Sequence, residues 1–88
     1  MSENTGSKQR LLIVDDSKVI RVTARKILRD HFETIEAVDG ENGWEILNNE
    51  GPFSLVVSDL TMPNLDGFGL LERIRSSRNP DIQDIHVI

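Results

Sequence analysis

Short unbroken apolar runs alternate along this chain with longer segments of mixed character. Residues 11–14 and 55–57 are the clearest runs, and continuous runs of this length predict strands that are buried on both faces of a parallel sheet. Residues 34–38 and 85–88 also have strand character, because β-branched residues dominate them. The pattern therefore predicts four strands.

The segment after the first apolar run predicts an amphipathic helix. Ser17 can cap its N-terminus, because a serine hydroxyl accepts a hydrogen bond from a backbone N–H of the first turn. Apolar residues recur there at helical spacing, so the arginines between them are expected to face solvent. The apolar residues are Ile20, Ala24, Ile27 and Leu28, and the arginines are Arg21, Arg25 and Arg29.

Two further segments also read as helices. Asp39 and Gly40 open a helix over residues 41–49, which Gly51-Pro52 ends. A helix over residues 67–75 is expected to place Phe68, Leu71 and Ile74 on one face, and residues 76–80 read as a loop. The order βαβαβαβ with short connections predicts an α/β fold, with a parallel sheet, right-handed crossovers and helices on both faces.

Acidic residues follow two of the predicted strands. Asp15 and Asp16 come directly after the first run, and Asp59 follows the third. In a flavodoxin-like strand order these two strands are neighbours, and ligands bind at their carboxyl ends. We therefore expect the three acids to meet at one edge of the sheet.

Clustered carboxylates repel one another unless a cation neutralises them. Mg²⁺ suits such a site, because it prefers oxygen ligands and keeps several waters. A carboxylate left partly free beside the metal can act as a nucleophile toward phosphorus. The acid cluster therefore predicts a magnesium site with a phosphorylation chemistry.

Composition narrows the function classes. The chain has 88 residues, a net charge of −5 and no cysteine, which fits one cytoplasmic domain without disulfides or thiolate zinc sites. The negative charge argues against binding to nucleic acid or to an anionic membrane. No apolar run approaches the ~20 residues of a membrane-spanning helix.

The motifs together resemble the receiver domain of bacterial two-component response regulators, with a flavodoxin-like (CheY-like) fold. The resemblance runs over residues 10–88, after a polar tail that we expect to be disordered over residues 1–9. The residues that carry it are Leu12-Ile13-Val14-Asp15-Asp16-Ser17, Val38-Asp39-Gly40, Val57-Ser58-Asp59-Leu60-Thr61-Met62-Pro63 and Asp66-Gly67.

The resemblance implies a role for each acidic residue. Asp59 would accept a phosphoryl group from a phosphohistidine on a partner histidine kinase or phosphotransfer protein. Asp16 and Asp59 would bind Mg²⁺ directly, together with the backbone carbonyl of Thr61, and Asp15 would act through a metal-bound water. Such a domain assists its own phosphorylation and dephosphorylation and is not a conventional enzyme.

The chain departs from the family pattern at its end. A receiver continues after its fourth strand with a Ser or Thr, a helix, a fifth strand that ends in a Lys, and a last helix, whereas this sequence stops at Ile88. We therefore interpret it as a receiver that lacks the last helix-strand-helix portion. Ile85, Val87 and Ile88 would then form an open sheet edge, which predicts self-association, with exchange of elements between chains as one form of it.

Other interpretations compete with this one. Asp15 and Asp16 alone would be typical of a helix-capping pair. A haloacid-dehalogenase-type phosphatase needs a second acid where this chain has Thr61. Asn64-Leu65-Asp66-Gly67 suggests a calcium loop, but the EF-hand register of that loop puts Arg73 where a bidentate glutamate belongs. The main rival is a fragment without phosphotransfer, acting only as a self-association or folding unit. Phosphorylation by acetyl phosphate would separate the two functions.

Overall fold

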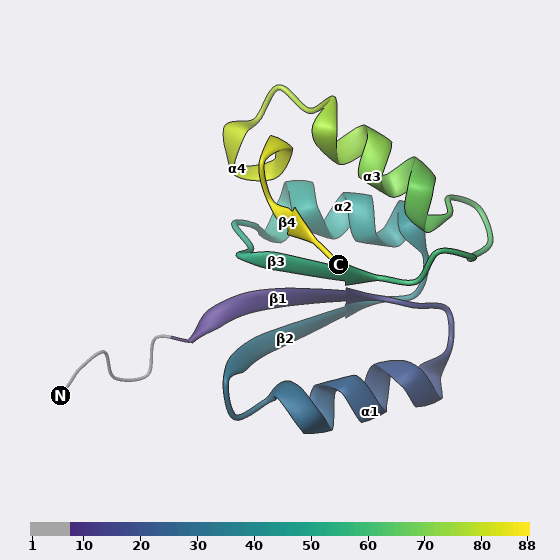
Figure 1. Cartoon of the computed structure of the whole chain (residues 1–88), viewed down its shortest axis with the longest axis vertical. Coiled ribbons are helices and arrows are strands. Elements are labelled where there is room, and N and C mark those ends of the chain that lie inside the picture. The colour runs from purple at the N-terminus through teal and green to yellow at the C-terminus, as the bar shows by residue number, and fades with distance from the viewer. Residues whose placement is uncertain (1–7) are drawn as a thin grey trace, which may run out of the picture.

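The computed structural model describes residues 8–88, in which strands and helices alternate along the chain (Figure 1). The strands are β1 (Gln9–Val14), β2 (Phe32–Ala37), β3 (Leu55–Ser58) and β4 (His86–Val87). The helices are α1 (Lys18–Leu28), α2 (Gly40–Glu50), α3 (Gly67–Arg75) and α4 (Pro80–Gln83). This succession confirms the predicted α/β class.

The four strands form one parallel sheet in the order β2-β1-β3-β4. Val14, the last residue of β1, pairs with Ala37 on one side and with Ser58 on the other. The carboxyl ends of these three strands therefore lie together, as the predicted order requires. Asp15 and Asp59 each leave the sheet one residue after that level.

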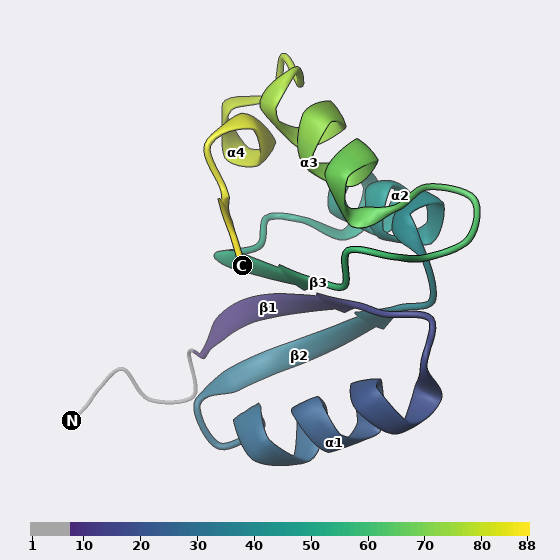
Figure 2. The same ribbon diagram turned by 45° about the vertical axis from the view of Figure 1, so that its right-hand side comes forward.

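The helices cover the two faces of the sheet unequally. Helix α1 lies alone on one face, and α2 and α3 lie on the other (Figure 2). The main core is on the α2 and α3 side, where Leu12, Val14 and Val56 of the sheet pack with Leu70 and Ile74 of α3, all of them fully buried. Burial of this apolar surface supplies the main free energy of folding.

The face that carries α1 is only half covered. Helix α1 packs on β1 and β2, and by strand alternation the side chains of Val57 and Ile88 point to the same face over β3 and β4. Val57 is half-buried and Ile88 is 74% exposed. On α1 itself, Ile20 and Ile27 are also exposed. An apolar surface is therefore left open beside α1.

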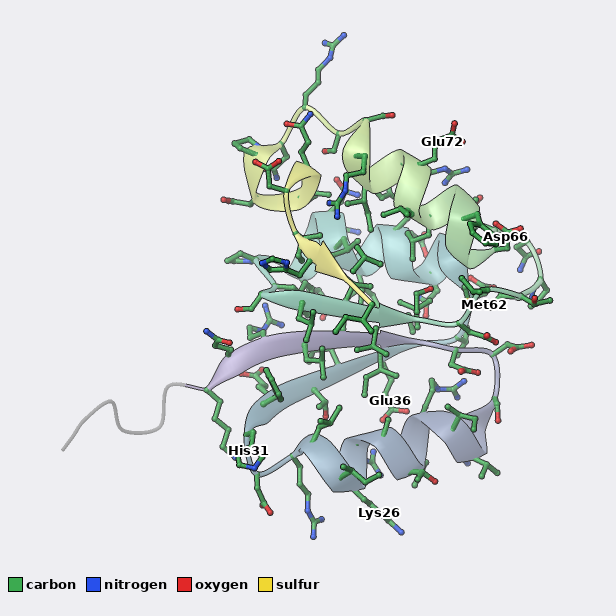
Figure 3. All side chains as sticks on the ribbon, in the orientation of Figure 1. Lys26, His31, Glu36, Met62, Asp66 and Glu72 are labelled. Atoms are coloured by element: carbon green, nitrogen blue, oxygen red, sulfur yellow. The ribbon has the colours of Figure 1, made fainter. Side chains whose placement is uncertain are left out.

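Two expectations for the first third of the chain are wrong in part. Gln9, expected in the tail, is the first residue of β1 and pairs with Phe32; residues 1–7 of that predicted tail lie outside the described residues. Arg21 and Arg25 do not face solvent freely, because both form ion pairs with Glu36 on β2. Figure 3 shows the Glu36 side chain between the sheet and α1.

The last third also differs from expectation. Phe68 is 65% exposed, and the buried face of α3 consists of Gly67, Leu70 and Ile74. Helix α4 stands where a loop was expected up to Pro80; Asn79 caps it, and Pro80 occupies its first turn. No helix in the range 8–88 is long and apolar enough to cross a membrane.

Candidate functional site

Three acidic side chains meet at the carboxyl edge of the sheet. One carboxylate oxygen from each of Asp15, Asp16 and Asp59 lies within 4.8 Å of the other two, so the predicted convergence is confirmed. The backbone of both strand ends is fixed by continued sheet pairing. The Asp59 N–H donates to the Val14 carbonyl at 2.9 Å, and the Asp15 N–H donates to the Ala37 carbonyl at 3.1 Å.

Neighbouring backbone groups orient two of the three carboxylates. Asp15 Oδ1 accepts a hydrogen bond from the Ser17 N–H at 2.8 Å, and Asp59 Oδ1 accepts one from the Leu60 N–H at 2.8 Å. Each of these carboxylates keeps a second oxygen for a ligand. Asp15 and Asp59 are half-buried, while Asp16 is the exposed member of the cluster.

Asp15 and Asp16 are not the cap of helix α1. That cap is Ser17, whose Oγ accepts a hydrogen bond from the Ile20 N–H at 3.3 Å. The capping interpretation of the acidic pair is therefore wrong, and the predicted Ser17 cap is confirmed. Both aspartates remain available at the sheet edge.

The cluster lacks a cationic partner of its own within residues 8–88. The ion pairs described there all lie elsewhere, at Arg10–Glu33, Arg21–Glu36, Arg25–Glu36 and Arg73–Glu41. The Arg21 guanidinium donates to the Asp15 backbone carbonyl at 2.7 Å but forms no ion pair with a carboxylate of the cluster, and adjacent unpaired carboxylates repel one another. Their oxygen donors are those that a hard divalent cation such as Mg²⁺ prefers, so the residues fit such an ion.

The loop from Asp59 to Asp66 begins at the third acid of the cluster and carries Thr61. Its base is tight, because the Gly67 N–H donates to the Leu60 carbonyl at 3.1 Å. A Cβ on Gly67 would lie 2.2 Å from the Asp59 carbonyl oxygen, so only glycine allows this approach. In the middle of the loop Met62 is buried in the core, while its neighbour Thr61 is exposed. Figure 3 labels Met62 and Asp66 at this end of the molecule.

A contact between Asp39 and Asn64 joins this loop to helix α2. Asn64 Nδ2 donates to Asp39 Oδ2 at 2.7 Å, and the Asn42 N–H donates to Asp39 Oδ1 at 2.8 Å. These donors, the Asn42 N–H first and the Asn64 amide second, hold the pKa of Asp39 below its usual value. The sequence correctly predicts Asp39 as a cap, but it carries no signal for a partner 25 positions away.

The chain also matches known proteins. The family model described as "Response regulator receiver domain" matches residues 11–88. This chain belongs to the response regulator receiver domain family. The receiver fold predicted from the motifs is thereby confirmed, and Asp15, Asp16 and Asp59 are the acids at its sheet edge.

Relatives and solved structures agree with this membership. The chain is 40% identical over 78 residues to a protein named probable chemotaxis protein CheY from Rhizobium etli, covering 82% of this chain and 57% of that protein. It is 38% identical to the N-terminal domain of a response regulator receiver protein from Methanoculleus marisnigri, with a TM-score of 0.81 over 92% of this chain and 64% of that one. Against the chemotaxis response regulator CheY4 of Vibrio cholerae the TM-score is 0.83 at 26% identity, over 92% of this chain and 66% of that one. The chain thus spans about three fifths of the length of these relatives.

Proposed function

We propose that this receiver domain accepts a phosphoryl group on Asp59 in a two-component phosphorelay. The donor is a phosphohistidine on a histidine kinase or phosphotransfer protein, and the compartment is the cytoplasm, which the lack of cysteine fits. The observation that carries the proposal is the meeting of Asp15, Asp16 and Asp59 within 4.8 Å at the sheet edge of a receiver domain.

In the proposed reaction a carboxylate oxygen of Asp59 attacks the phosphorus of the phosphohistidine. The new P–O bond forms as the P–N bond breaks, and the imidazole keeps the electron pair of the broken bond. Asp59 suits this role because one of its oxygens is already held by the Leu60 N–H, which leaves the second oxygen free to react. Asp15 Oδ1 is held by the Ser17 N–H instead, at 2.8 Å.

Asp16, Asp59 and the Thr61 carbonyl are the proposed direct ligands of Mg²⁺, with Asp15 acting through water. Bound Mg²⁺ supplies positive charge that neutralises the transferring phosphoryl oxygens. The chain itself fixes the positions of the aspartate residues, because the ends of β1 and β3, after which they follow, pair with each other. It also holds Thr61 close to Asp59 in sequence, inside a loop that Met62 anchors.

Phosphorylation with acetyl phosphate and Mg²⁺, followed by mass spectrometry, tests the proposed acceptor. We expect one phosphoryl group on the parent chain and none on Asp59→Asn. Asp66→Asn is the matched control, because it removes one acidic charge from the same loop but not from the cluster, and it should still be labelled. No label after prolonged incubation, or label on Asp59→Asn, would contradict the proposal.

A titration with Mg²⁺ tests the metal site independently of the chemistry. Amide resonances of residues 15, 16 and 59–61 should shift at millimolar Mg²⁺, and Asp16→Asn should weaken this response strongly. An unchanged Thr61 region in the parent chain would count against the site.

A second function, self-association, is favoured by the open face beside α1. Strand β4 is an edge of the sheet and pairs only with β3 among the described strands, and Ile88 and Ile27 are largely exposed on that side. A second copy of the chain would cover the exposed apolar side chains and pair with the edge backbone. This association needs no phosphotransfer, so it is the function that would remain if Asp59 were inert.

Light scattering across a dilution series measures this association. We expect oligomers that dissociate on dilution, and weaker association for Ile88→Asp, which puts a charge on the proposed interface. Phe68→Asp is the matched control, since Phe68 is similarly exposed but lies on α3, on the other face of the sheet. A monomer at all concentrations, or equal effects of both substitutions, would contradict self-association through β4.

A further inference from the structure

The loop that carries Thr61 is tied to the start of helix α2 by two neighbouring interactions. Besides the Asp39–Asn64 hydrogen bond of 2.7 Å, the Gly40 N–H donates to the Leu65 carbonyl at 3.0 Å. The approach is close, because a Cβ on Gly40 would lie 2.1 Å from that same carbonyl oxygen. The connection after β2 therefore contacts the tip of the connection after β3.

Asn64 has the backbone that this contact needs. Its φ is +68°, in the left-handed region that asparagine tolerates better than most residues. This conformation turns the chain at the loop tip, and the Asn64 amide meets the Asp39 carboxylate there. A hydrogen bond to a charged carboxylate is stronger than one between neutral groups.

Asp39 divides its two oxygens between two tasks. Oδ1 accepts from the Asn42 N–H and caps α2, while Oδ2 accepts from Asn64. Helix α2, which Asp39 caps, is itself fixed, because its residues Gly43 and Leu47 are buried. One end of the Asp39–Asn64 bond is thus rigid, and the other end lies on the loop three residues after Thr61.

We propose that Asp39 and Asn64 are positioning residues for cation binding at the acidic cluster. Neither belongs to the cluster; they act by holding the loop so that Thr61 stays beside Asp59. The loop is fixed at its base by Gly67 and in its middle by Met62, and the Asp39–Asn64 bond fixes its tip. This inference rests on the proposed Mg²⁺ site and adds two residues outside it.

Two substitutions break the bond without removing other functions of the residues. Asp39→Ser keeps a side chain that caps α2 but is too short to reach Asn64. Asn64→Gly keeps a residue that adopts positive φ and leaves the net charge unchanged. We expect each to weaken Mg²⁺ affinity about tenfold, the lower end of the usual effect for residues that support metal ligands. The double variant should lose no more than either single one, because both remove the same bond.

Asp66→Ser is the matched control for Asp39→Ser. Asp66 caps α3 through the Gly69 N–H, so the substitution also exchanges a capping aspartate for a capping serine and removes one acidic charge, here from the loop that carries Asn64. Mg²⁺ affinity should then fall less than about threefold, since exposed charges contribute little. Affinities come from amide-shift titrations, and folding is checked by Trp44 fluorescence.

A second readout needs no metal. The Gly40 amide, which donates to Leu65, should exchange with solvent faster in Asp39→Ser and in Asn64→Gly than in the parent chain and in Asp66→Ser. If exchange quickens but Mg²⁺ affinity matches the parent, Asp39 and Asn64 are only structural and the inference is wrong. If exchange is unchanged, the bond does not hold the loop and the inference is also wrong. If the variants show faster exchange but the parent chain itself gives no Mg²⁺ response, the proposed metal site is refuted instead.

Discussion

Arg21 on helix α1 is paired with Glu36 on strand β2, with 3.3 Å between Nε and Oε1. The Arg21 side chain is only 12% exposed, and its Nη1 also donates to the Asp15 carbonyl at 2.7 Å. One guanidinium therefore links the helix, the neighbouring strand and the turn that begins the acidic cluster. Arg25 adds a second contact to Glu36 at 3.1 Å.

Loss of the Glu36 charge should destabilise the fold more than loss of a better-formed but exposed ion pair. We expect Glu36→Gln to lower the free energy of unfolding by about 1–2 kcal/mol, because two guanidinium groups lose their acceptor in a half-buried place. The Arg73–Glu41 pair is shorter, at 2.8 Å, but its side chains are 41% and 48% exposed. Glu41→Gln should therefore cost less than about 1 kcal/mol. Urea unfolding followed by circular dichroism measures both; equal losses would mean that burial does not set the strength of these pairs.

Glycine substitutions should separate backbone contacts from side-chain contacts. Gly67→Ala is expected to destabilise by about 3 kcal/mol, since the new Cβ meets the Asp59 backbone, which cannot move without disturbing the site. At Gly69 the new Cβ would come closest to the end of the Leu65 side chain, at 2.6 Å, with Asp66 Oδ1 next at 3.4 Å and no backbone atom among its nearest neighbours. Because that side chain can rotate and alanine favours helix, Gly69→Ala should change stability by less than about 1 kcal/mol. Thermal unfolding of both variants gives the comparison, and similar losses would contradict it.

The buried face of α3 can be tested with two alanine substitutions. Leu70 is fully buried in the core, so Leu70→Ala should cost about 3 kcal/mol. Phe68 is 65% exposed, so Phe68→Ala should stay within about 0.5 kcal/mol. If Phe68→Ala instead costs more stability than Leu70→Ala in chemical denaturation, the buried face of α3 is the one that periodicity alone predicts.

Asp39 should make stability depend on pH in the acidic range. Its pKa is lowered by the Asn42 N–H and the Asn64 amide, so the folded state binds a proton less readily than the unfolded state. The stabilisation is complete above the unfolded pKa of about 4 and is lost as pH falls through the lower folded value. Unfolding measured from about pH 6 down to pH 3 should show a weaker pH dependence for Asp39→Asn than for the parent chain. If the free energy of unfolding falls equally with pH in both proteins, the charged Asp39 carboxylate does not stabilise the folded state.

Local sequence signals predicted much of this fold because they report local physics. Helix α3 spans Gly67–Arg75 as expected, and the Ser17 cap follows from turn chemistry. The strand order was expected from the flavodoxin-like arrangement of parallel strands, which the four apolar runs suggested. The acid cluster was predictable for the same reason, since strand ends in a parallel sheet share one edge.

The features that were missed depend on contacts between distant segments. Arg21 and Arg25 lie between apolar positions of α1, which favours solvent, but Glu36 on β2 supplies a partner that periodicity cannot reveal. The Asp39–Asn64 bond is another such contact. Helix α4 is different, because Asn79-Pro80 is a readable helix start and only its four-residue length hid it.

The buried Met62 side chain anchors the loop that follows Asp59. That side chain is 8% exposed and belongs to the main core, so the segment between Asp59 and Asp66 cannot swing away as a separate flap. Opening it requires Met62 to leave the core, which ties that motion to the larger unfolding events of the chain.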